Sequence, residues 1–185
     1  IALKESMETT HYSAMDKQGN IVGITTTINH SYGNKKIVDG AGFLLNNEMD
    51  DFSSKPGQQN TYGLIGYSAN SIQPSKRPLS SMTPSLIIDK EGNRMMTIGA
   101  AGGSRIITAV LQTIISVIDH NLDIQEAIDL PRTHSQWLPD VIRYEAQALT
   151  DKQKEELTKL NHMFDHDGNV ESGMYYLARA HGIYF

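Results

Sequence analysis

The chain has 185 residues, a formal net charge of -5 at pH 7 and hydrophobic residues at 39% of its positions. These values are ordinary for one globular domain with a packed core. The chain has no Lys/Arg-rich run, so a nucleic-acid-binding surface is not expected. No apolar stretch approaches the roughly 20 residues that span a bilayer. The absence of cysteine excludes disulfides and thiol catalysis.

The first half of the chain has the pattern of strands and turns. Two hairpins are expected, each with a Gly/Asn turn between its strands: 12–16 and 21–28 around Lys17-Gln18-Gly19-Asn20, and 86–89 and 94–98 around Lys90-Glu91-Gly92-Asn93. The apolar run 42–45 predicts a further short strand. Residues 53–77 are rich in Pro, Gly, Gln, Asn and Ser and indicate a long loop, of the kind that often forms a lid or a binding segment.

Helices are predicted in the second half. Apolar residues recur at helical spacing over 106–118, and a shorter helix over 124–130 should end at Pro131. Thr150 and Gln153 have capping-box spacing at the start of a third helix. One more strand is expected near residues 174–177. This order indicates an α+β fold, with helices packed on a largely antiparallel sheet.

Thr9 stands at the start of the first predicted strand. A threonine hydroxyl is a poor nucleophile without a base, but at a chain terminus its own α-amine can take the proton. An α-amine has a pKa of about 7.7–8, so a usable fraction is neutral at pH 7. The alternative interpretation is an ordinary strand start.

Three further segments carry side chains or backbone groups that suit an amino-acid substrate. Glu48 and Asp51 could pair with an ammonium group, or they could form a solvated acidic turn. Ser80 and Ser81 offer paired hydroxyls for a carboxylate, or a polar turn before a strand. The glycine-rich residues 99–104 precede an apolar helix, where backbone N–H groups could bind an oxyanion or simply turn the chain.

A metal site or a cofactor is not expected. The seven histidines are scattered, and His162 and His166 have a spacing of four but stand in a segment that is typical of a solvated turn. The glycine-rich segment is not followed by Gly-Lys-Ser/Thr, so it is not a phosphate-binding P-loop.

Taken together and in order, these segments resemble the gamma-glutamyltranspeptidases, which are N-terminal-nucleophile hydrolases. The resemblance runs from about Thr9 to Glu145 and is carried by the following stretches: Thr9-Thr10-His11-Tyr12-Ser13, 25–29, Leu44-Leu45-Asn46-Asn47-Glu48-Met49-Asp50-Asp51-Phe52-Ser53, Lys76-Arg77-Pro78-Leu79-Ser80-Ser81-Met82-Thr83-Pro84, 99–104, Pro131-Arg132 and Gln136-Trp137-Leu138-Pro139.

The resemblance implies an αββα sandwich built together with a larger upstream subunit, both produced by autoproteolysis of one precursor. Residues 1–8 would lie upstream of the cleavage site, and residues 9–185 would form the small-subunit catalytic domain. The implied activity is transfer of the gamma-glutamyl group of glutathione to water or to an acceptor amine. The implied location is periplasmic, secreted or on the cell exterior.

The resemblance also assigns roles to individual residues. By position, Thr9 would be the nucleophile, Thr27 would hydrogen-bond its hydroxyl, and Gly102 and Gly103 would form the oxyanion hole. Asn29, Glu48 and Asp51 would hold the α-amino group and its surroundings, and Ser80 and Ser81 the α-carboxylate. Tyr62 falls where some bacterial members carry a tyrosine that covers the pocket.

Two departures from the family pattern stand out. Residues 1–8 precede the nucleophile and the chain does not start with Met, so a fragment or processed product that is not in the mature cleaved form is expected. Residues 178–185 do not match the usual family ending, so the C-terminal strand is expected to be missing or divergent. Two alternatives remain: a related acylase that acts on glutaryl-type amides, and an inactive unprocessed fragment or scaffold.

Overall fold

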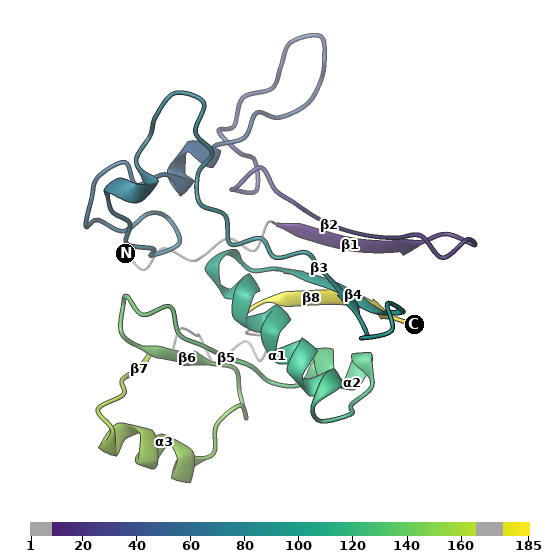
Figure 1. Cartoon of the computed structure of the whole chain (residues 1–185). Helices are drawn as coiled ribbons and strands as arrows, with labels where there is room; N and C mark the ends of the chain where they lie inside the picture. The colour runs from purple at the N-terminus through teal and green to yellow at the C-terminus, as the bar shows by residue number, and fades with distance from the viewer. Residues whose placement is uncertain (1–8, 166–175) are drawn as a thin grey trace.

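A computed structural model describes residues 9–165 and 176–185. Its central sheet has the antiparallel order β3 (Ser85–Ile88), β4 (Arg94–Ala101) and β8 (Arg179–Tyr184). Two helices, α1 (Ile106–Ile118) and α2 (Ile124–Asp129), cover one face of this sheet. The hairpin of β1 (Thr10–Met15) and β2 (Ile21–Thr26) lies over the other face, which gives three layers (Figure 1).

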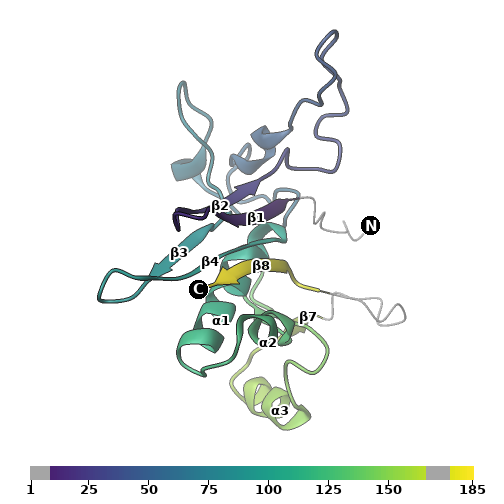
Figure 2. The ribbon, with the colours of Figure 1, turned by 90° about the vertical axis from the view of Figure 1, so that its right-hand side faces the viewer.

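A smaller unit packs beside these layers. Strands β5 (Thr133–His134) and β6 (Ile142–Tyr144) are antiparallel, whereas β6 and β7 (Phe164–Asp165) are parallel. Helix α3 (Asp151–Lys159) lies at the far end of this unit (Figure 2). The capping box of Thr150 and Gln153 begins α3, as the sequence predicts.

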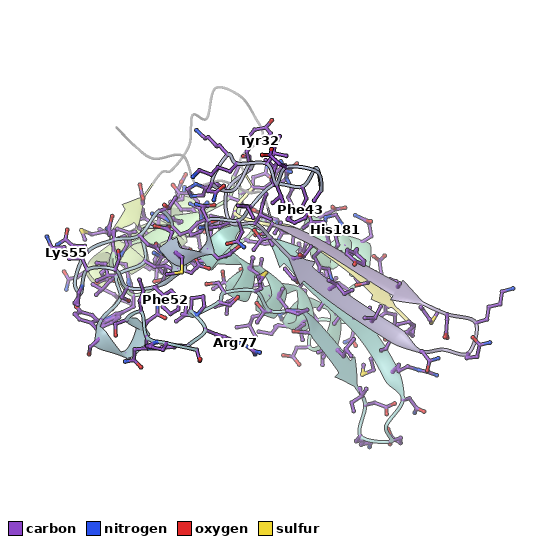
Figure 3. All side chains as sticks on the ribbon, turned by 90° about the horizontal axis from the view of Figure 1, so that it is seen from above. Tyr32, Phe43, Phe52, Lys55, Arg77 and His181 are labelled. Carbon is purple, nitrogen blue, oxygen red and sulfur yellow. The ribbon has the colours of Figure 1, made fainter. Side chains whose placement is uncertain are left out.

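The long segment between β2 and β3 contains only short 3-10 turns, η1 (Glu48–Asp51) and η2 (Ser68–Asn70). Phe52 and Lys55 mark the part of this segment that lies at one end of the molecule, away from the turns of the two hairpins, whereas Tyr32 and Phe43 lie nearer the middle in Figure 3. The α+β class, the two hairpins, the long loop and the three helices are therefore confirmed.

Two strand predictions are wrong. Residues 42–45 form only an isolated bridge between Leu44 and Ile37, because Gly40 and Gly42 turn the backbone at positive φ instead of extending it. The last strand begins at Arg179, not near 174, and residues 174 and 175 lie outside the described part of the chain. The ending expected to be missing or divergent thus forms β8, which pairs with β4 from Ala101↔Arg179 to Met96↔Tyr184.

Strand β4 is buried on both faces, and each face has a different character. Met96, Ile98 and Ala100 belong to the apolar core between the sheet and the helices. On the opposite face, Gly99 allows the His11 ring of β1 to approach closely, since a Cβ on Gly99 would collide with His11 Nδ1. His11 Nδ1 lies 2.7 Å from Thr25 Oγ1 within the hairpin, and Ser13 Oγ lies 3.4 Å from Thr97 Oγ1 of β4, so polar side chains lie between the hairpin and the sheet. Burial and the nearby charge of His181 lower the pKa of His11.

Candidate active site

A cleft of about 430 Å³, including its opening to solvent, lies where the long loop meets the end of the β1–β2 hairpin and the start of α1. Eight of the ten predicted site residues line it: Thr9, Thr27, Asn29, Asp51, Tyr62, Ser80, Ser81 and Gly103. Glu48 and Gly102 do not line it. The residues of the cleft outside the predicted set are Asn60, Leu64, Leu79, Met82, Ser104 and Ile106.

The hairpin brings the two threonines to the same place. Thr10 pairs with Thr26 at the open end of the hairpin. Thr9, just before β1, and Thr27, just after β2, are therefore the next residues of the two strands beyond this pair. Thr9 is only 9% exposed. The Thr27 hydroxyl accepts a hydrogen bond from the backbone N–H of Asn29 at 2.9 Å, which fixes its oxygen and leaves its hydrogen to donate. This arrangement suits a hydroxyl nucleophile with a hydroxyl partner beside it.

The turn from β4 into α1 needs glycine at two positions. Gly102 has φ 151° and Gly103 has φ 60°. A Cβ on Gly102 would lie 2.8 Å from the Ala178 side chain, and a Cβ on Gly103 would lie 2.8 Å from the Tyr62 ring. Gly103 therefore faces the cleft at the N-terminal end of α1, where backbone N–H groups favour negative charge. Gly102 packs behind it.

Tyr62 closes the cleft from the loop side. It is 7% exposed, and its ring lies over Gly103. Its hydroxyl donates to Asn29, with the backbone oxygen at 3.0 Å and Oδ1 at 2.5 Å. The Asn29 amide in turn donates to the backbone oxygen of Asn47 at 3.1 Å. In this structure the Asn29 side chain thus ties the covering tyrosine to the body of the site.

Glu48 and Asp51 lie at the two ends of η1, with Asp51 at the cleft and Glu48 behind it. Glu48 Oε1 is buried and has no hydrogen-bond partner among the described residues. Burial, the charge of Asp51 and a hydrogen bond to Asp51 raise the pKa of Glu48 to about 7. Burial also raises the pKa of Asp51, although the hydrogen bond from Glu48 opposes that shift. A proton on Glu48 would relieve the repulsion between the two carboxylates, and a bound cation would do the same.

Ser80 and Ser81 line the cleft from the segment just before β3. Ser80 Oγ accepts a hydrogen bond from the Met82 backbone at 3.2 Å, so its own hydrogen remains able to donate. Asn70 joins this segment to the acidic turn, because it donates to the Asp51 backbone oxygen at 2.7 Å and accepts from the Leu79 backbone at 2.9 Å. Sequence reasoning missed Asn70, since nothing local distinguishes it from other loop asparagines.

A buried ion pair lies behind the turn of Gly102 and Gly103 and fixes the residue that packs against Gly102. Arg132 and Glu145 are each 6% exposed in their side chains and approach to 3.2 Å. Glu145 Oε1 also accepts the Leu177 backbone N–H at 2.7 Å, and Arg132 donates to the Ala178 oxygen at 3.2 Å. The pair therefore holds the residue that packs against Gly102. Arg132 belongs to a stretch that carries the family resemblance, but its partner could not be read from the sequence.

Within residues 9–165 and 176–185, no group of three or more His, Asp or Glu side chains is placed to hold a metal ion. His166, the second histidine of the spaced pair, lies outside the described residues. In the same part of the chain, every helix is too short or too polar to cross a membrane.

Known proteins match this chain over most of its length. The family profile described as gamma-glutamyltranspeptidase matches residues 2–183, so the match includes β8. The glutathione hydrolase proenzyme of Escherichia coli (strain K12) is 51% identical over 145 residues, which are 78% of this chain and 25% of that protein. The chain spans about a quarter of the length of this relative and of the glutathione hydrolase proenzyme of Pseudomonas sp. (strain A14).

Solved structures are also similar to this chain. The crystal structure of an acivicin-inhibited gamma-glutamyltranspeptidase has a TM-score of 0.85 and 47% identity, and covers 95% of this chain and 89% of that one. Cephalosporin acylase from Bacillus halodurans shares the fold, with a TM-score of 0.71 at 20% identity, and covers 91% of this chain and 28% of that one. Because the family profile covers nearly every residue, and the cleft gathers the residues that carry the resemblance, the chain belongs to the gamma-glutamyltranspeptidase family.

Proposed function

We propose that this chain is the nucleophile-bearing small subunit of an enzyme that transfers the gamma-glutamyl group of glutathione and its conjugates to water or to acceptor amines. One observation carries the proposal: a single cleft contains a terminal-type nucleophile at Thr9, backbone donors at Gly103, and separate partners for an ammonium and a carboxylate. The Escherichia coli relative is a glutathione hydrolase proenzyme, and the similarity to it supports the same substrate.

Maturation would precede activity. In the intact chain the Thr9 nitrogen is an amide, which cannot act as a base. The Thr9 hydroxyl would attack the Glu8 carbonyl and form an ester, and water would then open the ester. This sequence leaves a carboxylate on Glu8 and a free α-amine on Thr9. It would separate residues 1–8 from a catalytic chain of residues 9–185. The Escherichia coli relative is a proenzyme, and the C-terminus of the acivicin-inhibited gamma-glutamyltranspeptidase has a role in autoprocessing; both fit such a step.

In the mature enzyme the α-amine of Thr9 would take the hydroxyl proton as the oxygen attacks the gamma-carbonyl. The oxyanion that forms would be stabilised by the backbone N–H groups of the turn at Gly102 and Gly103. Collapse would expel the amine of the leaving group, which takes the proton, and leave a gamma-glutamyl ester on Thr9. Water or an acceptor amine would then attack the ester and regenerate the hydroxyl. Thr27 would keep that hydroxyl oriented in both steps.

The acidic pair favours an amino-acid substrate over the glutaryl-type amides of a related acylase. Asp51 reaches the cleft, and Glu48 behind it has a buried oxygen that lacks a hydrogen-bond partner among the described residues. An ammonium group at this position would supply the missing positive charge, whereas a glutaryl group, which has no amine, would not. Asn29 would complete the ammonium side, and Ser80 and Ser81 would bind the α-carboxylate.

A larger subunit from the same precursor would complete the αββα sandwich. The described residues form three of the four layers, and the outer face of the β1–β2 hairpin leaves Tyr12 50% and Val22 45% exposed. Helix α1 also exposes large aliphatic side chains along one side, at Ile107, Leu111, Ile115 and Ile118. Such surfaces favour a stable partner. The proposed location outside the cytoplasm rests on the family resemblance alone.

Mass spectrometry after treatment of the full-length protein with a stoichiometric gamma-glutamyl affinity label tests the proposal. We expect the label on a Thr9 that has become N-terminal. Thr9→Ala should block both maturation and turnover, whereas Thr9→Ser should retain some of each because the hydroxyl and the amine remain. A label on any other residue would overturn the mechanism. A precursor that never splits before Thr9 would support the inactive scaffold instead.

A further inference from the structure

Gln136 makes hydrogen bonds with all of its amide atoms at the side of the cleft. Its Oε1 accepts from the Ser104 hydroxyl at 2.8 Å and lies 3.0 Å from His134 Nε2. Its Nε2 donates to the backbone oxygens of Gly63, at 3.4 Å, and Leu138, at 3.3 Å. The side-chain amide is therefore used as both acceptor and donor.

The position of Gln136 is fixed from the rest of the fold. It follows β5, and β5 is held on α1 by two residues of that helix. Gln112 donates to the Thr133 backbone oxygen at 2.8 Å and accepts its N–H at 3.1 Å. Thr108 Oγ1 lies 2.8 Å from His134 Nδ1. Gln136 thus extends from a rigid helix-strand contact towards the cleft.

The two arms of Gln136 reach two different parts of the cleft. One arm ends at Ser104, which lines the cleft and directly follows Gly102 and Gly103. The other ends at Gly63, the neighbour of Tyr62, whose ring lies over Gly103. Gln136 therefore joins the loop of residues 60–64 to this turn by hydrogen bonds from one side chain.

We propose that Gln136 is a positioning residue that couples the loop carrying Tyr62 to the turn Gly102-Gly103-Ser104. Gln136 then links the position of the loop over the substrate to the position of the turn that carries the oxyanion donors. A loosened loop would admit water to the acyl-enzyme and favour hydrolysis over transfer to an amine. The consequence for turnover rests on the proposed function, whereas the mechanical coupling does not.

Gln136→Glu separates the two arms. A carboxylate still accepts from Ser104 and His134, but it has no N–H for the oxygens of Gly63 and Leu138. The variant therefore releases the loop arm and keeps the turn arm. Gln125→Glu is the matched control, since it makes the same chemical change on an exposed position of α2, where Gln125 contacts only Asp129 among the hydrogen bonds seen.

Amide hydrogen exchange of the full-length protein measures the coupling without any need for turnover. In Gln136→Glu we expect exchange of residues 58–66 to rise about fivefold, the factor for one lost hydrogen bond, with α1 unchanged. The ratio of transfer to hydrolysis should fall by a similar factor, with a higher KM for the gamma-glutamyl donor and a kcat for hydrolysis within about twofold.

Exchange of residues 58–66 equal to that of Gln125→Glu overturns the proposal, whatever the activity. A wild-type protein without gamma-glutamyl turnover would refute the proposed function but leave the exchange result decisive for Gln136. If Gln136→Glu does not fold, Gln136→Met fills a similar volume without charge and removes both arms. The proposal then requires faster exchange in both 58–66 and 102–105, and it fails if either stays at the wild-type rate.

Discussion

The raised pKa of Glu48 predicts that the binding of a substrate ammonium group depends on pH. Glu48 has its pKa raised to about 7 by burial, by the charge of Asp51 and by their hydrogen bond. An ammonium group binds best when both carboxyls are ionised, so its binding should strengthen as pH rises through 7 and should release a proton from the pair. A substrate without the amine gains nothing from this ionisation.

The magnitude follows from the pKa of Glu48, which is raised to about 7. A carboxyl with that value is ionised in about one molecule in eleven at pH 6 and in about half at pH 7, a rise of about fivefold. This window lies below the pKa of about 7.7–8 of an α-amine, so a substrate amine stays largely protonated. Glu48→Gln removes the titrating group and should abolish the rise.

The assay compares kcat/KM for a gamma-glutamyl anilide with that for the corresponding des-amino glutaryl anilide. Titration of the Thr9 amine affects both substrates, so it cancels in the ratio. The ratio should rise about fivefold from pH 6 to pH 7 in the wild type and stay flat, at a lower value, in Glu48→Gln. The reasoning is refuted if the two substrates have the same pH slope, or if Glu48→Gln keeps the wild-type ratio.

The same group affects stability with a definite sign. The pKa of Glu48 is higher in the folded protein than its ordinary value of 4.5, so the folded state binds more protons between pH 4.5 and about 7. The contribution of Glu48 to the free energy of unfolding is therefore complete below pH 4.5 and is lost as pH rises through about 7. The melting temperature of the wild type minus that of Glu48→Gln should fall across this window, and a rise would contradict the assignment.

Three more predictions concern stability and the oxyanion turn. Arg132→Met or Glu145→Leu alone leaves a buried charge unpaired and should lower the free energy of urea unfolding by about 3–5 kcal/mol; the double variant should cost clearly less than the sum, and strict additivity would contradict the pairing. Gly99→Ala places a methyl group too close to the His11 ring and should cost about 1–3 kcal/mol in thermal unfolding, part of which His11→Ala in the same chain should recover; no recovery would mean that the ring is not the obstacle. Gly103→Ala, at φ 60°, should displace a backbone donor and lower kcat about tenfold, and an unchanged kcat would exclude that role.

The sequence by itself determined the elements whose signals are local. Both hairpin turns contain the same pattern, in which an Asp carboxylate accepts the N–H of an Asn four residues later, at 2.8 Å for Asp16 and 2.7 Å for Asp89. The apolar spacing of α1 and the capping box of α3 depend on residues three and four apart. These interactions form within one turn of chain, so no knowledge of the fold is needed to predict them.

The residue types of the site could also be named from the sequence, because the motif stretches are specific to the family. Their arrangement could not. Only the tertiary structure places Asp51 at the cleft with Glu48 behind it, and brings Asn70 to the backbone of Asp51 and Leu79. Burial and the resulting pKa shifts depend on neighbours from distant parts of the chain.

The C-terminal strand shows the same limit most clearly. Residues 179–184 carry a weak strand pattern with a glycine and a histidine, and they become β8 because β4 offers an open edge about 80 residues earlier in the chain. Gln136 likewise looks like an ordinary loop residue until the fold carries it between Ser104 and Gly63. Local hydrogen-bonding chemistry can be read from the sequence, whereas pairings between distant segments exist only once the whole core has brought them together.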